Sequence, residues 1–407
     1  MTSNNPITTN KICQGLKVAL VHDFLNQYGG AERVLLALHE MFPEAPIYTL
    51  LHDPEKMRGK FARADIRPSF LQKFPKFFKK RHKYMLPFMP TAPETFNLRD
   101  FDLVISSSSA FAKGVIVKPK IIHISYCHSP MRYAWDWNEK YLDEQALGKK
   151  RKLLARMLLN YVRIWDKVAA DRVDFFIANS EYTKERIKKY YGRESAVVYP
   201  PVDTNIVIPG LTRDPENTKS AEKLDSRFRG NDKTREDYFL IVSRLTPYKK
   251  IEVAIEAFNK LNLPLVVIGE GAPKYVRYLK SIAGPKTKFL GWLPDEKIKE
   301  YYSSCRAFVF PGEDDFGIAP VEAMAAGKPV IALRRGGATE TVIEGETGEF
   351  FDESTIEVLA DAVRRLMEKE KDYEPEKIRE QAMKFSKEKF MKNIKRVIGE
   401  IWERREN

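Results

Sequence analysis

Short apolar runs alternate with longer amphipathic stretches along the first half of the chain. The runs are too short for helices and predict buried strands, whereas apolar residues that recur every three or four positions predict helices. The expected strands are residues 17–21, 103–105, 121–124 and 175–178, and the expected helices are 31–42, 151–170 and 183–191. Alternation of this kind predicts a parallel sheet covered by helices.

The same alternation restarts after a break near residues 200–237. A long, charged amphipathic helix is expected to end the chain, over 385–406. The other expected strands are 238–242, 265–268, 288–290, 307–310 and 330–332, and the other expected helices are 251–261, 275–283, 295–304 and 320–326. The 407 residues are therefore expected to form two α/β domains.

The break between the two sets is polar, rich in turn-forming residues and without periodicity over 205–233. Such a composition predicts a loop or partial disorder, here as an insertion at 205–234. The segment is interpreted as a regulatory linker or as a tolerated surface insertion. The insertion is favoured because loops absorb added residues at a small cost in free energy.

Composition and charge narrow the classes of function. No run of about 18 apolar residues exists, and the apolar stretch near the amino terminus ends at His22 and Asp23, so neither a transmembrane helix nor a signal peptide is expected. Three scattered cysteines argue against a disulfide framework or a zinc cluster and fit a reducing compartment. The net charge of +13 suits nucleic acid, anionic lipid or phosphorylated substrates without choosing among them.

A glycine pair, Gly29 and Gly30, follows the first expected strand and opens the first expected helix. Glycine lets a ligand approach the backbone closely, and the amino terminus of a helix favours anions. On this segment alone, a plain strand-to-helix turn is an equally good interpretation.

A basic segment at 243–250 also lies between an expected strand and an expected helix, and it contains Arg244 and Lys249. The planar fork of Arg and the point charge of Lys together suit a diphosphate. The alternative is a solvated basic loop.

The segment 311–330 carries two acids, Asp314 and Glu322, one before a glycine-containing turn and one in the helix that the turn opens. Carboxylates accept hydrogen bonds from sugar hydroxyls, and the backbone N–H groups of the turn can donate others. Acids that complement the helix macrodipole are the alternative, but the segment is too particular for that explanation.

Together with 126–136, 179–183 and 199–203, these segments resemble retaining glycosyltransferases of family 4, in particular the branch of O-antigen mannosyltransferases. The resemblance covers nearly the whole chain apart from the break. It implies the GT-B fold, in which two Rossmann-like α/β domains with parallel sheets face each other and a carboxy-terminal helix crosses back to the amino-terminal domain.

The resemblance also implies domain roles. The implied division is an acceptor-binding domain at 1–200, joined by the crossing helix at 385–407, and a nucleotide-sugar-binding domain at 201–384. The two domains would close over the donor.

The resemblance assigns donor-binding residues one by one. Gly29 and Gly30 would bring backbone close to the donor phosphates, and Arg244 and Lys249 would neutralise the diphosphate leaving group. Asp314 stands where the family usually has its first Glu, and it is one methylene shorter. The remaining donor contacts are implied for Glu322 on the ribose, for the backbone of Phe316, Gly317 and Ile318 on the sugar hydroxyls, and for Gly291 and Trp292 at the base.

In the amino-terminal domain, His128 matches the active-site histidine of the family, which would face the donor sugar rather than act as a classical base. Without the family, a His in a Cys-His-Ser-Pro loop is an ambiguous polar residue. Arg132 is interpreted either as a contact to an acceptor phosphate or as part of a structural salt bridge. Asp23 would line the cleft or cap the glycine loop.

The segment 73–83 has six Lys or Arg among eleven residues, interleaved with three Phe. This composition favours an anionic membrane surface or a lipid-linked acceptor, and a solvated helix face is the alternative. Single-stranded nucleic acid is not expected, because no nucleic-acid-binding module is recognised. The residues expected at this surface are Lys79, Lys80, Arg81 and Lys83.

These features lead to one hypothesis and two alternatives. The hypothesis is a retaining transferase that moves a hexose, mannose from GDP-mannose, to a lipid-linked oligosaccharide in O-antigen, capsule or exopolysaccharide synthesis. It would work without a cofactor or metal, as a peripheral protein at the cytoplasmic face of the cell membrane. One alternative is a GT-B transferase or epimerase that uses a UDP- or dTDP-sugar and a soluble substrate, and the other is a non-catalytic basic binding protein on a GT-B scaffold.

Overall fold

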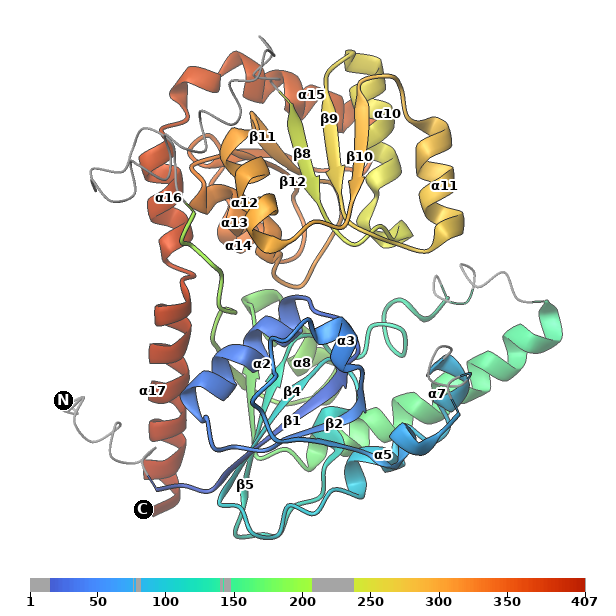
Figure 1. Cartoon of the computed structure of the whole chain (residues 1–407), viewed down its shortest axis with the longest axis vertical. Helices are drawn as coiled ribbons and strands as arrows, with labels where there is room; N and C mark the ends of the chain where they lie inside the picture. Colours follow the sequence, from blue (N-terminus) through green and yellow to red (C-terminus); the bar gives the residue numbers. More distant parts are fainter. Residues whose placement is uncertain are drawn as a thin grey trace. The chain divides into compact units, whose positions relative to one another are not determined.

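The computed structural model describes residues 15–75, 77, 82–139, 142, 148–206 and 238–406, with the side chains of His82, Lys83 and Glu406 left aside. The chain divides into two compact units (Figure 1). The first comprises Met1–Pro201 with Glu388–Asn407, and the second comprises Val202–Lys387. From residue 207 onward, the insertion predicted at 205–234 lies outside the described residues.

The first unit is built on a seven-stranded sheet in the order β3-β2-β1-β4-β5-β6-β7, in which every neighbouring pair is parallel. Parallel strands must be joined by crossovers, so helices follow most of the strands. The strands are β1 (Val18–Leu25), β2 (Ile47–His52), β3 (Ile66–Pro68), β4 (Leu103–Ser108), β5 (Ile122–Cys127), β6 (Phe175–Ala178) and β7 (Ser195–Val197).

Alternate residues of these strands point to opposite faces of the sheet. On one face, Val18 and Leu20 join a core with residues of α2 and of the last helix, α17. On the other face, Ala19 and Val21 join a separate core. The helices are α2 (Gly30–Met41), α3 (Pro54–Met57), α5 (Thr91–Glu94), α7 (Lys149–Asp171), α8 (Glu181–Tyr191) and α17 (Lys387–Glu406), with short 3-10 turns η1 (Phe70–Lys73), η2 (His82–Met85) and η3 (Ala112–Gly114).

The last helix confirms the predicted return of the chain to the first unit. Four of its apolar residues, Phe390, Ile394, Val397 and Ile398, are buried in the same core as β1. Their spacing of four, three and one places them on one side of the helix, which is the side that packs on the sheet. Figure 1 shows α17 as the red helix that runs along this unit.

The second unit is built on a six-stranded sheet in the order β10-β9-β8-β11-β12-β13, again with parallel neighbours throughout. Its strands are β8 (Phe239–Val242), β9 (Leu265–Ile268), β10 (Thr287–Gly291), β11 (Ala307–Phe310), β12 (Val330–Leu333) and β13 (Gly348–Phe351). Its helices are α10 (Ile251–Leu261), α11 (Pro273–Ile282), α12 (Asp295–Ser304), α13 (Ile318–Ala325), α14 (Ala338–Thr341), α15 (Ile356–Glu368) and α16 (Pro375–Met383), with 3-10 turns η4 (Pro247–Lys249) and η5 (Glu370–Asp372).

Both units confirm the predicted α/β class with two Rossmann-like parallel sheets. Every strand and helix expected from the pattern is present. The elements that were not expected are the strands β2, β3, β7 and β13, the helices α15 and α16 and the short helices α3, α5 and α14. Strand β1 continues to Leu25, so His22 and Asp23 lie within the strand rather than after it. Among the described residues, no helix combines the length and the apolar composition needed to span a membrane.

Candidate functional site

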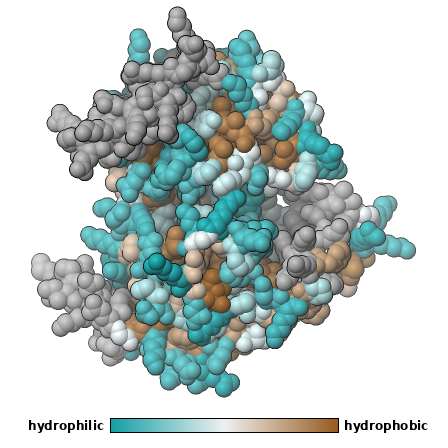
Figure 2. All heavy atoms as spheres, in the orientation of Figure 1, coloured by the Kyte–Doolittle hydropathy of each residue, from teal (hydrophilic) through white to brown (hydrophobic). Residues whose placement is uncertain are grey.

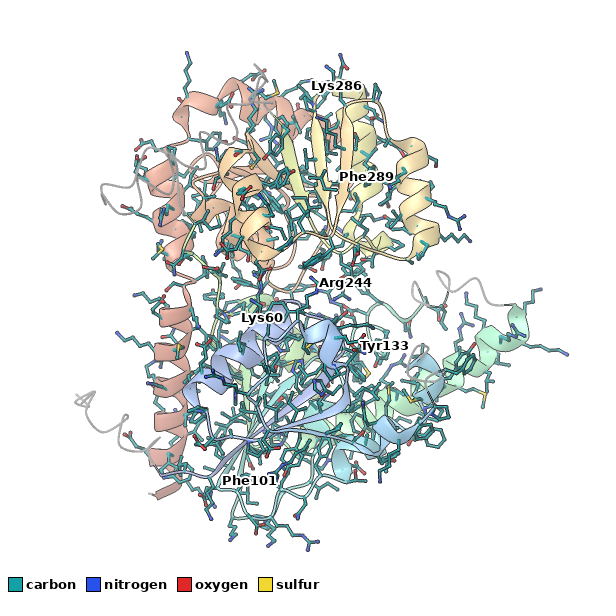
Figure 3. All side chains as sticks on the ribbon, viewed as in Figure 1. Lys60, Phe101, Tyr133, Arg244, Lys286 and Phe289 are labelled. Carbon is teal, nitrogen blue, oxygen red and sulfur yellow. The ribbon has the colours of Figure 1, made fainter. Side chains whose placement is uncertain are left out.

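Each sheet has one point where the strand order reverses, between β1 and β4 in the first unit and between β8 and β11 in the second. Loops that leave the carboxyl ends of two such strands diverge, and open α/β sheets bind ligands in the space between them. Several predicted donor-site residues, among them Arg244, Lys249 and Asp314, lie on these loops. Figure 3 shows one of them, Arg244, at the end of the sheet of the second unit. The two units are described in turn.

In the second unit, the basic loop after β8 is held by two glycines of the neighbouring loop. A Cβ on Gly269 would lie 1.8 Å from the carbonyl oxygen of Ser243, and a Cβ on Gly271 would lie 1.9 Å from that of Leu245. Gly269 also has a φ of 138°, which favours glycine. The chain on either side of Arg244 is therefore fixed by direct backbone packing.

Lys249, at the end of the same loop, is held against the loop that follows β11. A Cβ on Gly312 would lie 2.7 Å from the Cα of Lys249, so the two backbones touch only because residue 312 is a glycine. The Lys249 ammonium forms an ion pair with Asp314 and lies 5.6 Å from the ring centroid of Phe310. The structure thus brings together Lys249 and Asp314, which are 65 residues apart in the chain.

Asp314 leads into a sharp turn that begins α13. Backbone at Asp314 and Phe316 packs on Gly336 and Gly337, whose Cβ atoms would lie 2.2 Å and 2.3 Å from it. Gly317 precedes the helix with a φ of 84°. The first N–H groups of α13 have no acceptor within the helix, so this turn presents donors and the positive end of a helix dipole.

Glu322 lies one turn further along α13 and is 9% exposed. The hydroxyl of Tyr302, from α12, donates a hydrogen bond of 3.1 Å to Glu322 Oε2. This bond holds the carboxylate in place, and the spacing of four residues puts Glu322 on the same side of the helix as Ile318.

Arg244, Gly291 and Trp292 complete the predicted set in this unit. Arg244 is exposed, and among the described residues no hydrogen bond or ion pair holds its guanidinium. Gly291 ends β10 with a φ of 70°, and the indole of Trp292 is 45% exposed. An accessible guanidinium, a paired ammonium and a helix amino terminus at one edge of a sheet form an arrangement that can bind a polyphosphate.

In the first unit, Gly29 and Gly30 lie at the start of α2, as expected. The carboxylate of Glu32 turns back and accepts a 2.8 Å hydrogen bond from the N–H of Gly29. This contact satisfies one donor at the helix start, and the next N–H groups of the helix have no acceptor within it.

Glu32 also begins a chain of four polar side chains that ends at His128. His22 Nε2 lies 3.5 Å from Glu32 Oε1, and His22 Nδ1 lies 3.1 Å from Ser107 Oγ. Ser107 Oγ in turn lies 2.7 Å from His128 Nε2. A carboxylate only accepts, so every link is satisfied when His22 Nε2 carries a proton, Ser107 donates to His22 Nδ1, and His128 Nε2 donates to Ser107.

This chain of hydrogen bonds leaves one ring nitrogen of His128 open. Burial, with the nearby His22 as a smaller cause, lowers the pKa of His128 to about 3, so the ring is neutral at physiological pH. With Nε2 committed to Ser107, its Nδ1 is a hydrogen-bond acceptor that no described residue occupies. A neutral imidazole of this kind can orient a hydroxyl and carries no charge.

The loop that carries His128 is anchored from both sides. Arg186, on α8, donates hydrogen bonds of 2.8 Å to Ser129 Oγ and to Asp136 Oδ1. Asp166, on α7, accepts a 2.8 Å bond from the indole of Trp135. Within the loop, the guanidinium of Arg132 lies 5.2 Å from the ring centroid of Trp137.

Asp23 does not cap the glycine loop, and this corrects one of the two expectations for it. Its carboxylate accepts hydrogen bonds of 2.6 to 2.9 Å from four successive backbone N–H groups, those of residues 109–112. The side chain is 5% exposed, so it acts as the structural centre of the turn after β4. A buried ion pair between Lys113 and Asp166 closes the same region.

Comparison with known proteins assigns most of the chain to a family. Residues 28–206 match the family model described as Glycosyltransferase Family 4, and residues 222–385 match the model described as Glycosyl transferases group 1. The chain is a family 4 glycosyltransferase. The two matches correspond to the two units.

Relatives of this glycosyltransferase include mannosyltransferases. Alpha-1,3/1,6-mannosyltransferase ALG2 of Dictyostelium discoideum is 23% identical over 399 residues, which cover 86% of this chain and 90% of that protein. The GDP-mannose-dependent alpha-(1-6)-phosphatidylinositol monomannoside mannosyltransferase of Mycolicibacterium smegmatis is 28% identical over 218 residues, which cover 49% of this chain and 53% of that protein. The chain therefore spans about half the length of this second relative.

Solved structures agree on the fold of this glycosyltransferase. Anabaena HepE, in complex with UDP and glucose, aligns with a TM-score of 0.66 at 18% identity over 94% of this chain and 99% of that one. Sucrose-phosphate synthase from Thermosynechococcus elongatus aligns with a TM-score of 0.68 at 16% identity over the same shares. The fold is GT-B.

Some expected residues lie outside this description, and others were missed. Lys79, Lys80 and Arg81 lie outside the described residues, as does the side chain of Lys83. Four partners of site residues were not predicted from the sequence, namely His22, Ser107, Glu32 and Tyr302. A signal existed only for Glu32, which lies three residues after Gly29 as in a capping box, whereas His22 and Ser107 are 85 residues apart.

Proposed function

We propose that this glycosyltransferase transfers mannose from GDP-mannose, with retention of configuration, to a lipid-linked glycan in surface polysaccharide synthesis. The relatives named above support a mannosyl donor, and one of them carries GDP-mannose in its name. The single observation that carries the proposal is the positively charged site of the second unit. There Lys249, paired with Asp314, lies beside the turn that begins α13.

The proposed donor site neutralises the leaving group. Departure of GDP from mannose adds one negative charge to the two that the diphosphate already carries, and fixed cations and helix amino termini stabilise such charge in the transition state. Arg244 would supply a bidentate fork and Lys249 a point charge. Because Asp314 already pairs with Lys249, the diphosphate would compete with a carboxylate for the ammonium.

The acids and glycines of the same unit would orient the rest of the donor. Glu322, fixed by Tyr302, would accept hydrogen bonds from the ribose hydroxyls. The open N–H groups at the start of α13 would donate to the sugar, with Asp314 as an acceptor beside them. The residues proposed for these N–H groups and for the base are Phe316, Gly317, Ile318, Gly291 and Trp292.

His128 is proposed to orient the transferred sugar through Nδ1. Its pKa of about 3 makes it too weak a base to take the proton of the acceptor hydroxyl. We therefore assign that proton to the departing diphosphate, which leaves and accepts it on the same face of the sugar. This route gives retention without a double displacement, for which no pair of carboxylates is proposed.

The acceptor is proposed to be a polyprenyl-diphosphate-linked oligosaccharide at the cytoplasmic face of the membrane. Arg132 is proposed to contact its phosphate, and the basic segment at 73–83 to contact the anionic lipid surface. The charge of that segment, six cations among eleven residues, supports this assignment.

A thermal-shift panel with GDP, UDP, ADP and dTDP tests the donor. We expect GDP to raise the melting temperature most, and an Arg244→Ala/Lys249→Ala double variant to lose the shift. A Lys274→Ala/Lys392→Ala variant, which removes two exposed cations elsewhere, should keep it. A shift with UDP or dTDP alone would exclude GDP-mannose, and a normal GDP shift in the Arg244/Lys249 variant would overturn the proposed site.

A further inference from the structure

The outer face of α7 is apolar and exposed. Its large apolar residues are between 48% and 67% exposed and follow one another at steps of three and four, which places them in one stripe along the helix. They are Leu154, Met157, Tyr161, Ile164 and Val168, with Leu153 beside them. Figure 2 shows hydrophobic residues at the rim of the molecule over this helix.

The opposite face of α7 packs on the core of the first unit, as one face of a surface helix normally does. Leu159, Val162 and Ala169 are buried there, and Asp166 holds Lys113 and the Trp135 loop. A helix of this type normally presents polar residues to solvent, so a second apolar face marks a surface for interaction.

A neighbouring segment adds aromatic residues to the exposed surface. Phe77, Tyr84 and Phe88 are 55%, 50% and 49% exposed, and the rings of Phe77 and Tyr84 stack at 6.3 Å. Met85, which follows Tyr84, shares a core with Val162 of α7, so Tyr84 and Phe88 flank a residue that packs with this helix. Aromatic side chains of this kind favour the interface between water and lipid.

The charge around this face identifies its partner. Helix α7 has seven cations and two acids, and of the acids Asp166 is buried and Asp171 pairs with Lys167 at 2.6 Å. Lys149, Lys150 and Arg151 are exposed at the start of the helix, and no ion pair holds them within the described part of the chain. A second copy of this face would bring like charges together, whereas an anionic bilayer would complement them.

We propose that α7 is the membrane-docking helix of this enzyme, lying along an anionic bilayer with its apolar stripe in the headgroup region. At 1.5 Å per residue its 23 residues span roughly 35 Å, long enough for sustained contact along the surface. This inference rests on the lipid-linked acceptor proposed above. It adds that the docked helix is the one that anchors the loop of His128, so the surface that meets lipid is rigidly joined to a site residue.

Vesicle co-sedimentation of the full chain tests the proposal. The probe is phosphatidylcholine vesicles with or without about 30 mol% phosphatidylglycerol. We expect binding to the anionic vesicles, and at least a tenfold weaker partition for Leu154→Gln/Met157→Gln/Ile164→Gln. The matched control carries three substitutions of exposed apolar residues elsewhere, Tyr278→Gln/Ile343→Gln/Met383→Gln, and should bind like the parent protein.

A second pair of variants separates local from overall charge. Lys149→Gln/Lys150→Gln/Arg151→Gln should weaken binding several-fold, whereas Lys118→Gln/Lys274→Gln/Lys392→Gln, with the same change of net charge, should not. Equal binding by the α7 variants and their controls would overturn the proposal.

Two further measurements on the same samples keep the outcomes distinct. Sedimentation velocity would reveal a dimer that the α7 apolar variant dissociates, which would replace the bilayer with a second copy as the partner. Binding of GDP does not depend on vesicles. If the parent protein binds GDP but not vesicles, docking by α7 is refuted and the proposed function is not. If the parent protein does not bind GDP, the proposed function is refuted.

Discussion

The ion pair between Lys249 and Asp314 makes the cost of losing Lys249 depend on its partner. Lys249→Ala removes the ammonium and leaves the Asp314 carboxylate beside the proposed diphosphate position. The variant should therefore lose binding twice, through the missing attraction and through a new repulsion. Asp314→Asn in the same chain should restore the second part.

The repulsion can be sized. If the ammonium bridges both anions, they lie about 6–8 Å apart, and at an effective dielectric constant near 20 two unit charges repel by roughly 2–3 kcal/mol. The Asp314 side chain is 24% exposed, so salt screening over a Debye length of about 8 Å reduces this roughly by half. A remaining 1–1.5 kcal/mol corresponds to about a tenfold change in Kd.

Titration calorimetry with GDP on four proteins checks this. The proteins are the parent, Lys249→Ala, Asp314→Asn and the double variant. We expect the double variant to bind about tenfold more tightly than Lys249→Ala, Asp314→Asn to bind more tightly than the parent, and both differences to shrink at high salt. Equal Kd values for Lys249→Ala and the double variant would mean that Asp314 does not act on the diphosphate, and the donor-site assignment would fail.

Three other predictions follow from the same structure. Burial lowers the pKa of His123 to about 3, against 6.5 in an unfolded chain, so acidification protonates the unfolded state first. From pH 7 to pH 5 the free energy of unfolding should therefore fall by about 2 kcal/mol more in the parent than in His123→Asn. Urea titration at both pH values measures this difference. Equal pH dependence would show that His123 titrates normally. Ser107→Ala should lower the turnover of GDP-mannose up to about tenfold, because His128 loses the hydrogen-bond partner of its Nε2. The Kd for GDP should stay unchanged, and an unchanged kcat would show that Ser107 does not act on the site. Gly312→Ala should weaken GDP binding without changing any charge, because the new Cβ would lie 2.7 Å from the Lys249 Cα, and calorimetry that gives the parent Kd would contradict this.

The strands that could be predicted from the sequence differ from several that could not in how continuously apolar they are. Strands such as β9 and β11 are continuous apolar runs, because both of their faces are covered. The edge strands β3 and β7 have three residues each, are partly exposed and carry polar residues, so no run marks them. These edge residues are extended because they are hydrogen-bonded to a neighbouring strand, and that pairing cannot be seen in their sequence pattern.

The site shows the same division between local and distant information. The positions of Gly317 and Lys249 beside helix starts could be predicted, because a turn or a charge next to a helix start is visible over a few residues. The His22–Ser107 link was not, because strand order brings β1 beside β4, and nothing in either segment alone predicts it. Asp23 was expected either to line the cleft or to cap the adjacent glycine loop, and of these the capping is wrong, because the turn 109–112 offers its carboxylate four N–H donors.

The return of α17 to the first unit has a consequence for biosynthesis. A ribosome releases the strands of the first unit early, but the core that contains Val18 stays open until Phe390, Ile394 and Ile398 emerge, after the whole of the second unit. The second unit, from Val202 to Lys387, is complete before then and can fold on its own during synthesis. The core that is begun first is thus completed only after the second unit has been made, and until then a nascent chain of this enzyme carries an unfilled apolar groove.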